Sequence, residues 1–258
     1  MRVIILGAGT AIPAPRRSPA GILVRIGREQ VLLDAGPGSA AKVHRAGGSL
    51  WELDRIFLTH YHVDHCLDLV AILFAIRIAR PSRRRRTLTV YGPRGLRQWY
   101  QRLNVAFQKW LTPRGYRLVL RELSHATLSL PGYTLVARPM RHSAPALGYR
   151  LIERPGGRSL AYSGDTDTCP EVIALGQAAD VFILECSVPD GQKVAGHLTP
   201  SDCGRIAQAA GCRRLVLTHR YPTLDGSDIR GRVRQHYQGP LTIARDGTVF
   251  TLDACAQF

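Results

Sequence analysis

The chain alternates between short apolar runs and longer amphipathic stretches, a pattern typical of an α/β protein. In the first half, the strands that the pattern predicts are "RVIIL", "GILVRI", "QVLLDAG", "RIFLT" and "LTVYG". Helices are predicted near 38–46, 66–80 and 94–108. Four consecutive strands then follow, with glycine- and proline-marked turns between them: "YRLVLREL", "ATLSL", "YTLVARPM" and "LGYRLIE".

The alternation resumes after residue 159. It predicts the strands "SLAYSGD", "DVFILE" and "RLVLTH", helices near 170–178 and 200–210, and then a terminal helix and hairpin. The helix in "LTPSDCGRIAQAAG" has Thr199 or Ser201 as its N-cap and Gly211 beyond its end. Two β-rich halves, roughly 1–122 and 123–258, predict one domain built as a layered α/β sandwich. A nicotinamide cofactor is not expected, because Ile12 stands at the third glycine position of "VIILGAGTAIP" and Pro13 follows it.

Composition indicates a protein of the cytoplasm. The apolar start of the chain is too short for a secretory signal. The longest apolar run, Leu69 to Ile76, is far below the roughly 20 residues of a membrane span. We therefore expect no contact with a membrane. The six cysteines are scattered and form no CxxC pair, so we also expect free thiols in a reducing compartment.

The net charge is strongly positive, +16 at pH 7, and arginine supplies nearly all of it. No acidic residue lies between Asp68 and Glu122, whereas that segment carries many arginines, among them the run Arg83, Arg84, Arg85 and Arg86. A segment of one sign attracts polyanions, and the planar guanidinium suits phosphate. We therefore expect RNA binding through Arg83–Arg86, with a solvated face or a contact between protomers as the alternatives.

One short stretch carries most of the candidate chemistry. "FLTHYHVDHCLDLVAILFAI" places His60, His62, Asp64 and His65 within six positions, where a strand ends and a helix begins. Side chains two apart on an extended segment point to the same side, so His60 and His62 suit one metal ion. Asp64 and His65 lie at the helix entrance and suit a second ion. Two adjacent metal ions are therefore predicted.

"THYHVDH" matches the HxHxDH signature, and the chain resembles the metallo-β-lactamase superfamily. The other segments that carry the resemblance are "LLDAGPG", "YGPRGL", "RHSAPALGYRL", "SLAYSGDT", "ILECSV", "GHLTP" and "LVLTHRY". Within the superfamily the chain is similar to the ribonuclease Z branch. The resemblance implies an α/β fold of four layers, an αβ/βα sandwich of the metallo-β-lactamase type.

The resemblance also implies the roles of individual residues. It assigns His60, His62 and His142 to the first metal, Asp64, His65 and His219 to the second, and Asp165 to a bridge between them. Nitrogen-rich ligands suit Zn²⁺, with Mn²⁺ left open. The implied reaction is two-metal hydrolysis. The expected catalytic groups are Asp64, His197 as proton donor, and Glu185, which orients His197.

The substrate is less determined than the chemistry. Ribonuclease Z enzymes trim the 3′ ends of precursor tRNA, which implies an RNA partner, and the family suggests a homodimer. Many carry a long tRNA-gripping arm between the counterparts of His142 and Asp165, where this chain has only a short hairpin around 155–157. The first alternative is a hydrolase of cyclic nucleotides, other phosphodiesters, lactones or thioesters. The second is a non-catalytic RNA-binding protein with a structural metal site.

Overall fold

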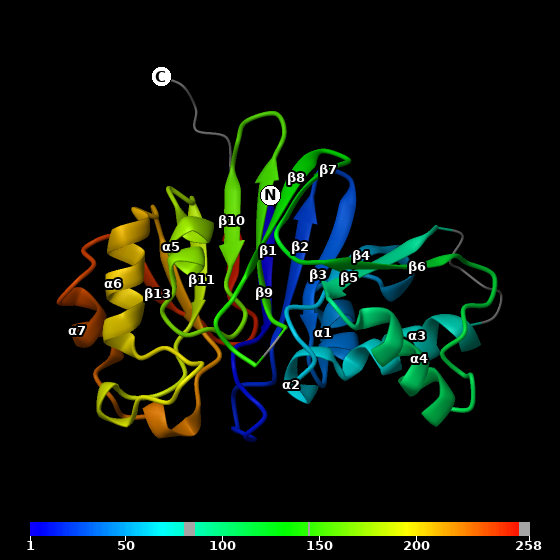
Figure 1. The fold of residues 1–258 in the computed structure, drawn as a ribbon, viewed down its shortest axis with the longest axis horizontal. Helices are drawn as coiled ribbons and strands as arrows, with labels where there is room; N and C mark the ends of the chain where they lie inside the picture. Colours follow the sequence, from blue (N-terminus) through cyan, green and yellow to red (C-terminus); the bar gives the residue numbers. More distant parts are fainter. Residues whose placement is uncertain (80–85, 144, 253–258) are drawn as a thin grey trace.

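The fold consists of two β-sheets, each covered by helices on its outer face (Figure 1). The computed structural model describes residues 1–79, 86–143 and 145–252. The first sheet has the order β14-β1-β2-β3-β4-β5-β6, and the second β13-β12-β11-β10-β9-β8-β7. The strands of the first are β1 (Arg2–Gly7), β2 (Gly21–Ile26), β3 (Glu29–Ala35), β4 (Leu53–Phe57), β5 (Leu88–Pro93), β6 (Leu118–Leu123) and β14 (Val249–Thr251). Those of the second are β7 (Ala126–Leu130), β8 (Tyr133–Pro139), β9 (Leu147–Glu153), β10 (Ser159–Tyr162), β11 (Val181–Glu185), β12 (Leu215–Thr218) and β13 (Leu241–Ile243).

The helices form the two outer layers. The layer on the first sheet contains α1 (Ser39–Arg45), α2 (Val63–Cys66), α3 (Asp68–Ile78) and α4 (Leu96–Ala106). The layer on the second sheet contains α5 (Pro170–Gly176), α6 (Pro200–Ala210) and α7 (Ile229–Arg234). Thr199 is the N-cap of α6 and forms a reciprocal capping box with Asp202. The helix predicted near 66–80 is α3, which follows directly on the short α2.

Alternation along the strands builds the layers. In β1, Val3 and Ile5 enter the core between the two sheets, whereas Ile4 and Leu6 pack under the helices. The core between the sheets takes side chains from both halves of the chain, so neither half buries its inner face alone. The four-layer αβ/βα sandwich is confirmed, and the assignment of 1–258 to one domain stays a prediction.

The terminal hairpin that the sequence suggests is wrong. β13 pairs in parallel with β12 in the second sheet, and β14 pairs antiparallel with β1 in the first. Between them the chain turns at Gly247, whose N–H donates to the carbonyl of Ile5 at 2.8 Å. Each strand satisfies the backbone groups of a different sheet edge, which a local hairpin would leave unpaired.

The hairpin between β9 and β10 lies at the end of the sandwich away from the loops that carry His142 and Asp165 (Figure 1). β9 runs away from the His142 loop and β10 returns towards Asp165. Seven residues of β9 span roughly 23 Å at ~3.3 Å per residue, so the turn lies about that far from the His142 loop.

No helix within the described ranges is long and apolar enough to cross a bilayer.

Candidate metal centre

The candidate ligands meet at one edge of the two sheets, where strands end. His60 and His62 follow β4, and His142 follows β8. Asp165 follows β10, and His219 comes directly after β12. The carboxyl ends of neighbouring strands converge at one edge of a sheet, and here two such edges face each other.

The first group of ligand atoms contains His60, His62, His142 and Asp165, all within 4.8 Å of one another. His62 Nδ1 lies 3.2 Å from His142 Nε2. Asp165 Oδ2 lies 3.8 Å from Nε2 of both His60 and His142. Three imidazoles and one carboxylate oxygen therefore surround one point.

The second group contains Asp64, His65 and His219. His65 Nε2 lies 3.1 Å from His219 Nε2, and His219 Nε2 lies 3.3 Å from Asp64 Oδ2. The other oxygen of Asp165, Oδ1, lies 3.2 Å from His65 Nε2 and 3.5 Å from His219 Nε2. Each oxygen of Asp165 thus faces a different group of histidines.

Two unpartnered buried atoms test whether metal ions suit this arrangement. His60 Nε2 and Asp165 Oδ1 are buried and have no hydrogen-bond partner. Buried polar atoms are normally satisfied, and both of these are lone-pair donors aimed at the ligand groups. The residues present therefore fit a divalent-metal centre.

Three of the candidate histidines, His60, His142 and His219, have a hydrogen-bond partner at Nδ1 that fixes the ring. His142 Nδ1–H donates to the carbonyl of Gly196 at 2.9 Å, and His219 Nδ1–H donates to Ser187 Oγ at 3.1 Å. His60 Nδ1–H donates to Thr59 Oγ1 at 3.0 Å. In each case Nε2 is left with its lone pair facing the centre, the usual support for metal-binding histidines.

Comparison with known proteins identifies the family of the chain. The model of the β-lactamase superfamily domain matches residues 29–220, from β3 to just beyond β12. The chain belongs to the metallo-β-lactamase superfamily. It is 29% identical to a ribonuclease Z of Nocardia farcinica over 303 positions, which cover 95% of each protein. This metallo-β-lactamase fold is therefore that of a metal-dependent hydrolase.

Two solved metallo-β-lactamase-fold structures resemble the chain over nearly its whole length. YhfI from Bacillus subtilis is 25% identical with a TM-score of 0.84, covering 96% of this chain and 98% of that one. The short form of human tRNase Z is 25% identical with a TM-score of 0.80, covering 98% and 100%. The resemblance read from the motifs is confirmed.

Asp34, at the end of β3, is a residue of the candidate site that motif analysis did not assign. Its Oδ2 accepts from His65 Nδ1 at 2.8 Å and from Tyr162 OH at 2.8 Å, and its two oxygens bind the N–H and hydroxyl of Thr59. Asp34 is fully buried and has a φ of 55°, a strained value for a residue with a side chain. The sequence did contain a sign of this role, because Asp34 ends the apolar strand in "VLLDAG". An acid buried at such a position requires a hydrogen-bonding or charged partner.

His219 and Gly164 show the backbone cost of building the centre. His219 has a φ of 52°, a left-handed value that turns its ring back from the end of β12 towards Asp165. Gly164 precedes Asp165 with a φ of +58°, and a Cβ there would lie 2.7 Å from Thr59. Only glycine allows the Asp165 loop to approach the end of β4 this closely.

Burial and charge set the protonation states of the site. Burial lowers the pKa of His60 to about 2 and also lowers the pKa of His142, so both rings stay neutral. Burial would raise the pKa of Asp165, but His219 and His65 outweigh it and hold that pKa well below its ordinary value. Burial would lower the pKa of His65, but Asp165 and Asp34 raise it well above its ordinary value. His65 therefore retains a proton beside the buried carboxylates of Asp34 and Asp165, and a cation bound at the centre would displace it.

His197 and Glu185 lie side by side above this centre. His197 Nδ1–H donates to Glu185 Oε1 at 3.0 Å, and the ring stacks on His219 with centroids 5.9 Å apart. Glu185 is fully buried and also accepts from the N–H groups of Thr166 and Leu198. Burial would lower the pKa of His197, but the bond to Glu185 outweighs it and raises that pKa above its ordinary value.

Lys193 secures the loop that carries His197. Its Nζ lies 2.8 Å from Asp167 Oδ1 and 2.7 Å from Asp202 Oδ2, and it also donates to the carbonyl of His197. Asp167 in turn accepts from the N–H of Gly196 at 3.1 Å. The loop is thereby joined both to the Asp165 segment and to the first turn of α6.

The arginine run is only partly described. Arg83, Arg84 and Arg85 lie outside the described residues. Arg86 is exposed, and its guanidinium lies 3.5 Å from Asp54 Oδ1. The cysteines that the structure describes, Cys66, Cys169, Cys186, Cys203 and Cys212, are buried and free.

Proposed function

We propose that the chain is a binuclear phosphodiesterase of the ribonuclease Z type that cleaves RNA and processes the 3′ end of tRNA. The position of Asp165 carries the proposal, because its two oxygens face two separate groups of imidazoles. A structural zinc site is closed by four ligands, whereas eight histidines and aspartates with candidate ligand atoms meet here, His197 among them. That excess argues against the RNA-binding alternative in which the metal is only structural.

His60, His62 and His142 are proposed to hold one ion, and Asp64, His65 and His219 the other, with Asp165 shared. The donor set is rich in imidazole nitrogen, which favours Zn²⁺ over Mn²⁺. When bound, two divalent ions supply an activated water and positive charge for the phosphoryl oxygens. Asp34 accepts a hydrogen bond from His65 Nδ1 and so keeps that ring oriented with Nε2 towards the centre.

His197 is proposed to protonate the departing oxygen of the substrate. Its Nδ1–H is held by the buried carboxylate of Glu185, which orients the ring and stabilises its protonated form. The other ring nitrogen is left for the substrate. An RNA alkoxide is a poor leaving group, so a positioned acid contributes substantially to its cleavage.

Charge and similarity support RNA as the substrate. The chain carries a net charge of +16, which favours a polyanion. Two of its relatives are named ribonuclease Z and tRNase Z. The buried free thiols of the described residues agree with a reducing, cytoplasmic location.

A second candidate is the hydrolysis of small phosphodiesters such as cyclic nucleotides. The short turn between β9 and β10 favours it, because this segment ends far from the metal centre. The alignment with the Nocardia enzyme runs over 303 positions, more than the 258 residues of this chain. The relative therefore has residues with no counterpart here, and RNA binding would have to use another surface.

The two candidates are separated by a substrate panel with protein of measured metal content. The panel contains a precursor tRNA, cyclic nucleotides and a bis-p-nitrophenyl diester. Cleavage of the precursor at its 3′ end with higher kcat/KM than any small diester is the expected result. Cleavage of cyclic nucleotides with the precursor left intact would contradict the RNA assignment and favour the second candidate. A chelated sample should lose every activity.

A further inference from the structure

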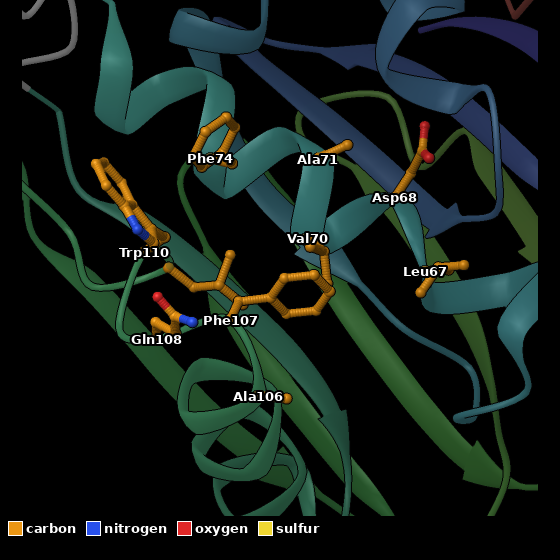
Figure 2. Close-up of a pocket in the computed structure, with 10 residues that line it drawn as sticks. Leu67, Asp68, Val70, Ala71, Phe74, Ala106, Phe107, Gln108 and Trp110 are labelled. Carbon is orange, nitrogen blue, oxygen red and sulfur yellow. The ribbon is translucent and has the colours of Figure 1, made fainter.

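An apolar groove of about 600 Å³ lies between α3 and the segment that follows α4 (Figure 2). Its volume falls within the ~300–1,000 Å³ range of sites that hold organic ligands. The side chains that form it come from two stretches, 67–74 and 106–111. Neither stretch contributes to the metal centre.

Three aromatic side chains of the groove are open to solvent. Trp110 is 50% exposed, Phe107 44% and Phe74 40%. Phe74 and Trp110 meet edge to face with centroids 5.8 Å apart, and Phe107 extends towards Val70 from the opposite wall (Figure 2). Rings left exposed together in this way indicate a surface that binds something flat or apolar.

The groove begins beside the metal centre. Leu67, at its near end, comes two residues after His65. The segment from α2 to α3 is almost continuously helical, so Phe74 lies roughly 10 Å beyond Leu67 at ~1.5 Å per residue. A single-stranded nucleic acid held at the metal centre can therefore continue into the groove.

The surroundings of the groove are positively charged. The guanidinium of Arg77 lies over the ring of Trp110, 5.3 Å from its centroid, and Lys109 is exposed between Phe107 and Trp110. Arg102 precedes the groove residue Ala106 by one turn of α4. Asp68 is the one carboxylate among the lining residues of the described chain, and it accepts from the N–H of Ala40 at 2.7 Å.

We propose that this groove is a stacking platform for single-stranded RNA, on which bases of the substrate lie against Phe107 and Trp110. Base stacking on aromatic rings combined with phosphate pairing to cations is the usual way to hold a single strand without sequence preference. A second copy of the chain would bring the same cations against themselves, so the charge favours a polyanion. The inference rests on the proposed RNA substrate and assigns it a second contact.

Binding is measured apart from cleavage. Metal-stripped protein is titrated with a fluorescent single-stranded RNA, and subunit number is measured by sedimentation. The test variant is Phe107→Ala/Trp110→Ala, and Trp110→Phe keeps an aromatic ring. The control is Val249→Ala, which truncates an equally exposed apolar side chain (45%) on β14. Metal-loaded samples are assayed on the bis-p-nitrophenyl diester.

The double variant should bind RNA at least about ten-fold more weakly, since each stacked base contributes about that much. Trp110→Phe should retain most of the affinity, and the control and all diester rates should match the parent. Unchanged RNA affinity in the double variant would overturn the platform even if the parent cleaves RNA. A change from dimer to monomer with unaltered affinity per subunit would also overturn it and identify a contact between copies. RNA binding that the variants weaken in a protein without ribonuclease activity would keep the platform and reject the proposed function.

Discussion

The two helical layers of the sandwich are built alike but finished differently. On the second sheet, α5, α6 and α7 bury their apolar faces in a closed core that includes Val172, Ile206 and Val233. On the first sheet, α3 and α4 also cover a core, yet their outer sides leave large apolar residues exposed. On the helices these are Phe74, Ile78 and Val105, and in the adjoining turns they are Leu67, Phe107 and Trp110.

The difference teaches that covering a sheet does not account for the first layer. A helix needs only one apolar stripe to cover a sheet, and the α5–α7 layer shows that this suffices here. Apolar side chains beyond that stripe lower solubility and do not stabilise the isolated chain. The α3–α4 layer directly follows the HxHxDH segment, so we interpret its surplus as serving the substrate.

The largest expected effect comes from removing the carboxylate that faces both groups of metal-ligand candidates. Asp165→Asn takes away the charge shared by the two ligand groups, so bound metal should fall below two ions per chain. Activity on RNA and on small diesters should drop together, to about one thousandth or less. Metal analysis with parallel rates measures this. Asp225→Asn, an exposed carboxylate, serves as the control, and normal metal content with normal rates in Asp165→Asn would refute the binuclear centre.

His197→Ala separates proton donation from metal binding. Cleavage of RNA should fall by about two orders of magnitude or more, the usual contribution of a general acid. The bis-p-nitrophenyl diester, whose leaving group needs no proton, should be hydrolysed at nearly the parental rate. Equal losses on both substrates with reduced metal content would assign His197 to the metal centre instead.

The pH profile sharpens the same test. Because Glu185 raises the pKa of His197, the protonated ring persists to higher pH than an ordinary histidine. RNA cleavage that needs this proton is therefore present below that pKa and declines as pH rises through it. His197→Ala should lose the alkaline decline, and Glu185→Gln should move it to lower pH. An alkaline decline that survives in His197→Ala would exclude this residue as the donor.

The contrast between the layers also predicts stability. Ile206→Ala in α6 removes a side chain that is 1% exposed and should cost about 2–5 kcal/mol of unfolding free energy. Val105→Ala in α4 truncates a side chain that is 73% exposed and should change it by no more than about 0.5 kcal/mol. Denaturant midpoints measure both. A loss in Val105→Ala comparable to that in Ile206→Ala would mean that the α3–α4 surface is part of the folded core.

Much of this architecture was readable from the sequence because its patterns are local. The strands of the first half follow from alternating or continuous apolar runs, and α6 from its Thr199 cap and Gly211 end. The ligand groups were readable because each lies just after a predicted strand, within a motif. His197 and Glu185 were placed together by motif alone, and the structure puts them in contact.

The remainder depended on contacts between distant segments. β13 and β14 looked like a hairpin because they are close in sequence, but the edges that they complete belong to different sheets. Asp34 gave only a buried carboxylate as its signal, since its partners His65 and Tyr162 are far along the chain. The groove was unreadable because exposure of Phe107 and Trp110 is a property of packing and leaves no periodic pattern.

The smallest expected effect concerns Lys193, which secures the His197 loop on the α5–α7 side of the molecule. Lys193→Met removes its ion pairs with Asp167 and Asp202, and a partly exposed pair of this kind contributes about 1 kcal/mol or less. RNA cleavage should therefore slow by about five-fold or less, with kcat affected more than KM. Metal content and diester hydrolysis should stay near parental values, because the Gly196 carbonyl that supports His142 is also held in place by the bond from the Gly196 N–H to Asp167. Lys193→Arg should restore most of the rate, since a cation there can still reach both carboxylates. If Lys193→Met instead weakens RNA binding with kcat unchanged, the lysine contacts the substrate directly, and the α5–α7 side would share the task that we assign to the α3–α4 groove.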